Sequence, residues 1–154
     1  MKFFEKIFLI SIISLLLLSC GYTPLYKNQK NLNFSISIND ISGDRKINNI
    51  IKNKLSRYNL VEREKIYNIT INSEYNKKIV AKDTAGNVTD YKISVYINFD
   101  VKSEKYNKLL KFEESFSMKK FDDKVEEIDY EKNIKNNLVG IITQKLISQL
   151  MLNK

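Results

Sequence analysis

Four stretches of the chain alternate apolar and polar residues, and this period of two predicts four β-strands, each with one wet face. The third alternation, from Tyr91 to Val101, is the longest. The pattern of the second can continue to Val80, and Glu114 interrupts the apolar phase of the fourth. The expected strands are residues 32–39, 66–75, 91–101 and 109–119.

A first amphipathic helix is expected between the first two strands, at residues 45–59. Its apolar residues lie three and four positions apart, which puts them on one face of a helix. These residues are Ile47, Ile50, Ile51, Leu55 and Tyr58. Either Ser42 or Asp44 can serve as the N-cap, because both side chains carry an oxygen that accepts a backbone N–H.

A second, longer helix is expected after the fourth strand, from an acidic segment to about residue 151. Its apolar stripe consists of Ile134, Leu138, Ile141, Ile142, Leu146 and Leu150. Asp123 followed by Glu126 has the spacing of a capping box, and Asp129 is an alternative start. Gly140 costs ~1 kcal/mol inside a helix, and close packing on the sheet would explain its presence.

The order strand, helix, three strands, helix predicts an α+β fold. Turns are expected at residues 40–44, 83–87 and 106–108, because they contain turn-forming residues such as Gly86. The short turns make the last three strands an antiparallel meander, whereas the first strand reaches the sheet through a helix and can run parallel. The expected architecture is a two-layer α/β sandwich with two helices on a four-stranded, mostly antiparallel sheet.

The amino terminus has a different character from the rest of the chain. Lys2 and Lys6 precede an apolar run, residues 7–18, which is shorter than the ~20 residues of a transmembrane helix. That length and order of charges are typical of a secretory signal peptide. The alternative is a buried helix, but the run is apolar on every face and lies at the extreme amino terminus.

The end of the apolar run, Leu17-Leu18-Ser19-Cys20, resembles the cleavage motif of bacterial lipoproteins. The resemblance implies cleavage before Cys20 and attachment of acyl chains to that residue, and two or three such chains hold a protein firmly to a membrane. Gly21 after the cysteine, in place of Asp, favours the outer membrane. The chain is therefore expected to comprise a signal peptide (1–19), a lipidated tether (20–31) and one domain (32–154).

Composition narrows the possible chemistry. The chain of 154 residues has one Cys and no His, so an internal disulfide, a thiolate zinc site and a histidine base are all excluded. The net charge of +8 coincides with abundant Lys, Asn and Ile, which codon bias alone can produce. Export from the cytoplasm argues against a nucleic-acid partner. No cofactor is indicated.

Adjacent carboxylates are the only candidates for acid–base catalysis. Two carboxylates can do glycosidase-type acid–base work if they are held 5–10 Å apart in a cleft. These pairs are Glu113-Glu114, Asp122-Asp123 and Glu126-Glu127. No Gly-rich or nucleophile motif accompanies them, and a solvated charged surface is the simpler interpretation. We therefore expect no catalytic residue, no metal site and no enzymatic activity.

Two lysine clusters are the better candidates for binding. Lys77, Lys78 and Lys82 precede the Gly86 turn, and Lys119, Lys120 and Lys124 follow the fourth strand. In an antiparallel meander both clusters lie at the same end of the sheet, where they could converge on an anionic ligand. The alternative is generic solubilising charge. Four tyrosines could add contacts to a partner: Tyr75, Tyr91, Tyr96 and Tyr106.

Three features together resemble the LptE family of lipopolysaccharide-assembly lipoproteins. They are the opening Cys20-Gly21-Tyr22-Thr23-Pro24-Leu25-Tyr26, the segment 83–89 that leads into a long strand, and the order of the elements. The resemblance covers residues 17–152. It implies an outer-membrane lipoprotein whose domain lies inside the LptD β-barrel as plug and assembly partner, and which binds lipopolysaccharide. The Lys- and Asn-rich surface departs from typical members.

Overall fold

The computed structural model describes residues 33–59, 63 and 65–152. The predicted signal peptide, Cys20 and the predicted tether lie outside these residues. The elements are β1 (Phe34–Gly43), α2 (Arg45–Leu55), a 3₁₀ turn η2 (Ser56–Tyr58), β2 (Lys65–Lys82), β3 (Val88–Ser103), β4 (Tyr106–Lys119) and α3 (Lys124–Leu152). Neither helix of the described residues has the length and apolarity needed to cross a bilayer.

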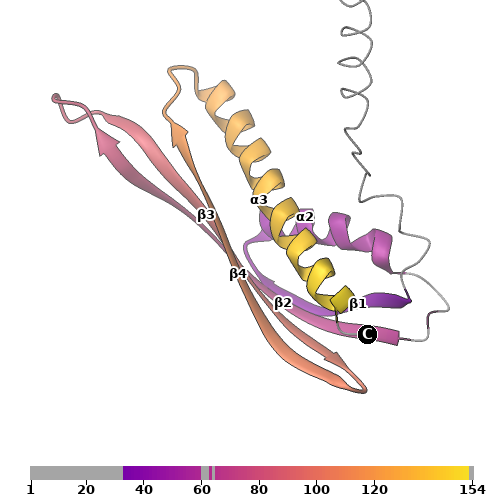
Figure 1. Cartoon of the computed structure of the whole chain (residues 1–154). Coiled ribbons are helices and arrows are strands. Elements are labelled where there is room, and N and C mark those ends of the chain that lie inside the picture. Colours follow the sequence, from indigo (N-terminus) through magenta and orange to yellow (C-terminus); the bar gives the residue numbers. More distant parts are fainter. Residues whose placement is uncertain (1–32, 60–62, 64, 153–154) are drawn as a thin grey trace, which may run out of the picture. The chain divides into compact units, whose positions relative to one another are not determined.

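The strands form one sheet in the order β1-β2-β3-β4 (Figure 1). β1 runs parallel to β2, and the pairs β2–β3 and β3–β4 are antiparallel. Both helices lie on one side of the sheet, α2 over β1 and β2 and α3 over β3 and β4. The predicted α+β class, the order of the elements and the two-layer architecture are confirmed.

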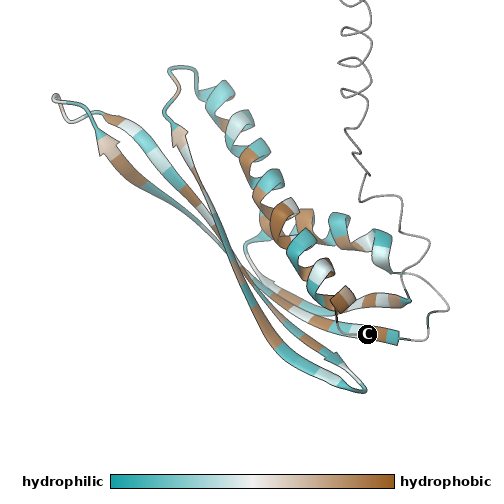
Figure 2. Ribbon diagram, viewed as in Figure 1, coloured by the Kyte–Doolittle hydropathy of each residue, from teal (hydrophilic) through white to brown (hydrophobic). Residues whose placement is uncertain are grey.

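The core lies between the helices and the sheet, and each strand contributes alternate residues to it. In Figure 2 this appears as hydrophobic positions that alternate with hydrophilic ones along the strands. Tyr67 is fully buried and makes edge-on contacts with the rings of Phe34 and Tyr106, at 5.4 and 5.7 Å between centroids. Its hydroxyl lies 3.5 Å from the Leu150 carbonyl oxygen, which joins the end of α3 to the sheet.

The junction between β1 and α2 depends on one glycine. Gly43 has a φ of +97°, in the left-handed region that side chains disfavour. A Cβ atom there would lie 1.8 Å from the Ser73 carbonyl oxygen, which already accepts a hydrogen bond from the Asp44 N–H at 3.0 Å. Asp44 then caps α2, because its carboxylate accepts from the Ile47 N–H at 2.9 Å. Of the two predicted caps, Asp44 is therefore the correct one.

Some predicted boundaries were wrong, for local reasons. Residues 40–43 were expected in a turn but continue β1, because a bulge between Ile38 and Asp40 breaks the period of two and puts Ile41 back in phase. The turn expected at residues 106–108 is strand: Tyr106 starts β4, and the chain turns at residues 104–105.

The first helix ends differently from its prediction, the second starts at the first of its two predicted positions, and Gly140 has a different neighbour from the one expected. The first is α-helical only to Leu55 and finishes as a 3₁₀ turn to Tyr58. The second starts after Asp123, whose carboxylate accepts from the Val125 and Glu126 N–H groups at 2.6 and 3.3 Å. Gly140 was expected to pack closely on the sheet, but it does not. The atoms nearest its missing Cβ belong to the Lys54 side chain of α2, the closest at 3.4 Å.

Gly43→Ala should destabilise the domain by about 3 kcal/mol or more, because it combines a strained backbone with a collision against β2. Chemical denaturation of the variant and the parent measures the loss. Gly140→Ala is the matched control, since its Cβ meets only the flexible end of Lys54 and it should gain up to ~1 kcal/mol of helix propensity. Equal stability of Gly43→Ala and the parent would contradict this account of the junction.

Candidate functional site

The two lysine clusters lie at one end of the sheet, as the meander requires. Lys82 pairs with Val88 across the β2–β3 hairpin, and Lys119 pairs with Asp90 on β3. The Lys120 N–H donates to the Thr89 carbonyl oxygen at 2.7 Å. In Figure 1 the β2–β3 hairpin projects beyond the helices at this end.

The turn at the tip of this hairpin is held by the Asp83 side chain. Its carboxylate accepts hydrogen bonds from the Ala85 N–H at 2.9 Å and from the Asn87 N–H at 2.8 Å. The Asn87 side-chain amide donates a third hydrogen bond at 3.0 Å. This bond has the largest effect on the carboxylate, and together with the backbone hydrogen bonds it holds the pKa of Asp83 below its ordinary value. Gly86 supplies a φ of +85°. The predicted turn at residues 83–87 is confirmed, and the hairpin end is preorganised.

The alternation of β2 sends neighbouring lysines to opposite faces of the sheet. Lys77 points to the helix side, where its ammonium lies 3.0 Å from Glu127 and 2.8 Å from Glu131, both on α3. It also lies 4.2 Å from the centre of the Tyr91 ring. Burial alone would lower the pKa of Lys77, but hydrogen bonds to the two glutamates raise it. Lys77 is therefore a structural cation and not a free ligand group.

Glu127 is the buried centre of this ion cluster, with a side chain only 2% exposed. It accepts from Lys124 at 2.8 Å as well as from Lys77, so one member of the second lysine cluster is also engaged. The hydrogen bond from Lys124, followed by that from Lys77, lowers the pKa of Glu127 to about 2. Burial opposes this change and is outweighed.

Glu131, one helical turn further along α3, extends the cluster. It accepts from the Tyr75 hydroxyl at 2.8 Å and from Lys135, whose ammonium lies 3.9 Å from the centre of the Tyr75 ring. Burial would raise the pKa of Glu131, but hydrogen bonds from Lys135, Lys77 and Tyr75 lower it to about 2. Burial and the contact with Glu131 raise the pKa of Tyr75.

Sequence analysis missed this ion cluster, although a signal was present. Glu127 and Glu131 lie four residues apart and continue the buried stripe of α3 towards its amino end, ahead of Ile134 and Leu138. A charged residue on the apolar side of a helix needs a partner of opposite charge. The matching position on the sheet was Lys77, which shares a face with Tyr75 on β2.

The remaining lysines form a cationic surface at the hairpin end. Lys78 and Lys92 are direct cross-strand partners on the face of the sheet opposite the helices, and both are exposed. Like charges directly opposite one another are unfavourable, so this pair lowers stability unless an anion neutralises it. Lys92 was not among the predicted residues. We call the cationic surface the exposed set Lys78, Lys82, Lys92, Lys119 and Lys120, none of which has an ion pair within the described part of the chain.

The other candidate residues are dispersed. Glu113 and Glu114 point to opposite faces of β4, and the Glu114 carboxylate is paired with Lys145. Tyr106 is buried in the core, and the Tyr75 hydroxyl is bound within the ion cluster. Tyr96 lies on the face opposite the helices. Among the described residues, no group of His, Cys, Asp and Glu is arranged to hold a metal ion.

Comparison with known proteins gives similarity of structure only. No protein-family model matches the chain, and no curated protein matches its sequence. The chain is similar to rare lipoprotein B from Shewanella oneidensis, with a TM-score of 0.54, 14% identity, and coverage of 75% of this chain and 100% of that one. It is also similar to an uncharacterized lipoprotein B from Nitrosomonas europaea, with a TM-score of 0.53, 14% identity and coverage of 76% and 82%. A minor lipoprotein from Acinetobacter baumannii is similar with a TM-score of 0.50 and 11% identity, and the match covers 77% of this chain and 96% of that one. At these identities the likeness shows a shared fold.

Glu127→Gln should lower the free energy of unfolding by about 1.5–3 kcal/mol at neutral pH, because it removes charged hydrogen bonds from a buried site. The folded-state pKa of Glu127 is about 2, below its ordinary value of 4.5, so its contribution is complete above pH 4.5 and is lost as the pH falls towards 2. The difference between parent and variant in urea unfolding should shrink over that range.

Glu126→Gln is the matched control, because Glu126 is the exposed neighbour of Glu127 in the first turn of α3. Its effect on the free energy of unfolding should be under about 0.5 kcal/mol. A Glu127→Gln loss that stays constant from pH 7 to pH 2 would mean that the charge of Glu127 is not the stabilising feature.

Proposed function

We propose that the protein is an envelope lipoprotein of the lipopolysaccharide-assembly type, anchored in the outer membrane by acyl chains on Cys20. The observation that carries the lipoprotein class is the fold shared with rare lipoprotein B, and the lipopolysaccharide-assembly type comes from the resemblance of the sequence to the LptE family. The signal-like residues 1–19 and the opening Cys20–Tyr26 are a second kind of support, because they are local sequence patterns, whereas the structural comparison rests on the fold.

In this proposal lipopolysaccharide binds at the cationic surface. Its phosphates and acidic sugars are anionic, and grouped lysines attract such a ligand. The opposed pair Lys78 and Lys92 supports this assignment, since an anion between them would relieve their repulsion. Lys77 and Lys124, which sequence analysis grouped with them, have a structural role in the ion cluster instead.

The proposed protein partner is an LptD-type β-barrel, with the domain as plug and assembly partner. A barrel lumen is hydrophilic, and the face of the sheet that the helices leave uncovered is polar enough to enter it. β2 presents Asn68, Thr70, Asn72, Glu74 and Asn76 on that face. Tyr96 lies among these polar residues, directly between Glu74 and Glu113.

Reversing the charge of both Lys78 and Lys92 to Glu should weaken lipopolysaccharide binding about tenfold or more, equivalent to ~1.4 kcal/mol. Titration of the purified protein with lipopolysaccharide measures the affinity. The matched control is the pair Lys46→Glu and Lys132→Glu, which makes the same change in net charge at exposed positions of the helices, whereas Lys78 and Lys92 lie on the opposite face of the sheet. An equal loss of affinity in the control would mean that net charge alone causes the effect. Unchanged affinity in both pairs of variants would show that lipopolysaccharide does not bind at the cationic surface.

Purification of the tagged chain from cells grown with labelled palmitate tests the anchor and the partner together. We expect the label and an LptD barrel protein to elute with the chain in mild detergent. Cys20→Ala should lose the label, because Cys20 is the only cysteine. A labelled chain without the barrel would favour a small lipoprotein that binds an anionic ligand alone, and a labelled Cys20→Ala chain would refute the lipid anchor.

A further inference from the structure

β4 is a long strand with one unpaired edge. It ends the sheet, and within the described residues only β3 pairs with it (Figure 1). Its pairing with β3 runs from Tyr106 to Lys119 without a register shift, so the strand is regular along its whole length. The other edge strand, β1, carries a bulge near Asn39, which is a common protection against edge-to-edge pairing. β4 lacks that protection.

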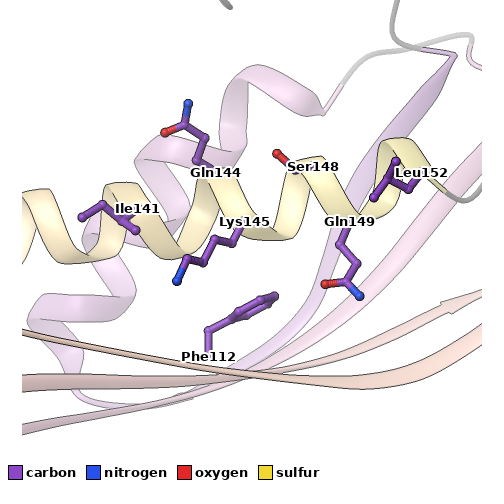
Figure 3. Close-up of a pocket in the computed structure, with 7 residues that line it drawn as sticks. All are labelled: Phe112, Ile141, Gln144, Lys145, Ser148, Gln149 and Leu152. Atoms are coloured by element: carbon purple, nitrogen blue, oxygen red, sulfur yellow. The ribbon is translucent and has the colours of Figure 1, made fainter.

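A shallow apolar groove accompanies this edge on the helix side. It encloses about 440 Å³ between β4 and the carboxyl-terminal half of α3. Figure 3 shows the Phe112 ring facing α3 below Lys145 and Gln149, with Ile141 and Leu152 on either side of them along the helix. Ile141 is 42% exposed and Leu152 is 85% exposed. These apolar side chains lie beside the open edge, where a partner that pairs with β4 would approach them.

Two charged residues of β4 lie symmetrically about Phe112 and have opposite signs. Lys111 and Glu113 flank it, and both lie exposed on the face opposite the helices. If two copies of β4 pair antiparallel with Phe112 on the two-fold axis, each Lys111 lies directly opposite Glu113 of the other copy. Opposite charges in direct cross-strand pairs are favourable, and like charges are unfavourable.

Neighbouring registers lack this complementarity. Centring the pair on Lys111 would place two lysines together, and centring it on Glu113 would place two glutamates together. The Phe112-centred register also keeps both helix layers on one side and pairs every residue from 106 to 118, because paired residues of antiparallel strands share a face. It brings the two Phe112 rings together beside the grooves.

We propose that the occupant of this edge is a second copy of the same chain, which forms a two-fold symmetric dimer through antiparallel β4–β4 pairing centred on Phe112. Such an interface is isologous, so one patch supplies both halves of every contact. The paired form closes both open edges and covers the exposed parts of Ile141 and Leu152. It requires neither lipopolysaccharide nor a barrel. It describes the chain outside a barrel, because Glu113 cannot face a barrel lumen and a second copy at the same time.

Charge exchange provides the test. The full chain in detergent solution should sediment as a dimer. Lys111→Glu or Glu113→Lys alone places like charges opposite each other twice and should raise the dimer dissociation constant at least tenfold, whereas the double variant Lys111→Glu/Glu113→Lys should restore it. Only pairing with an identical copy predicts this rescue, since a different partner would meet the reversed charges unchanged.

Cross-linking fixes the register. In a chain with Cys20→Ala, Phe112→Cys should form a disulfide-linked dimer, because directly opposed Cα atoms lie ~4.5–5.5 Å apart. Ser115→Cys, on the same strand, should not, because its two copies would be six residues apart along the strands, about 20 Å. A monomer at all concentrations, or a dimer that ignores the charge changes, would overturn the proposal. A monomer that binds another protein through Phe112 would assign the edge to that protein.

Discussion

Both helices pack on the same face of the sheet, and every strand must therefore bury one face and expose the other. This constraint produces the period of two in the sequence, and it makes adjacent residues serve different purposes. On β2, Ile69 and Ile71 enter the core while Thr70 between them faces solvent. The same rule holds where the side chains are charged, so that Lys77 supports the fold and Lys78 is available to a ligand.

In its amino-terminal part, α3 contacts the sheet through the ion cluster and not through the apolar core. The helix continues past Ile134 towards its amino end, but opposite it β2 presents Tyr75 and Lys77 in place of aliphatic residues. Burying Glu127 there is costly unless every charge has a partner. Six polar side chains satisfy one another in this cluster, which makes the position of α3 more specific than an apolar contact would.

The sequence predicted the class of the fold and the order of the elements, because alternation and helical spacing are local patterns that burial enforces. The end of β1 was not predicted. A bulge near Asn39 shifts the alternation of apolar and polar residues by one position, and this break in the pattern was interpreted as a turn. Lys92 was missed for a different reason. Its importance comes from lying opposite Lys78, and the cross-strand register depends on the turn at residues 83–87 and on the irregularities near Ala81. The turn could be predicted from local residues, but the irregularities could not.

The same alternation gives the uncovered parts of the sheet two separate capacities. At the hairpin end, the exposed face of β2 and β3 gathers like charges that an anion can neutralise. At the β4 edge, Phe112 lies on the helix side, whereas Lys111 and Glu113 lie on the open side with opposite signs. In the same β4–β4 register, the two copies can then make an apolar contact on one face of the sheet and charge pairs on the other. The two surfaces use different charged side chains, but β4 contributes to both, because Lys119 of the cationic surface is the last residue of that strand.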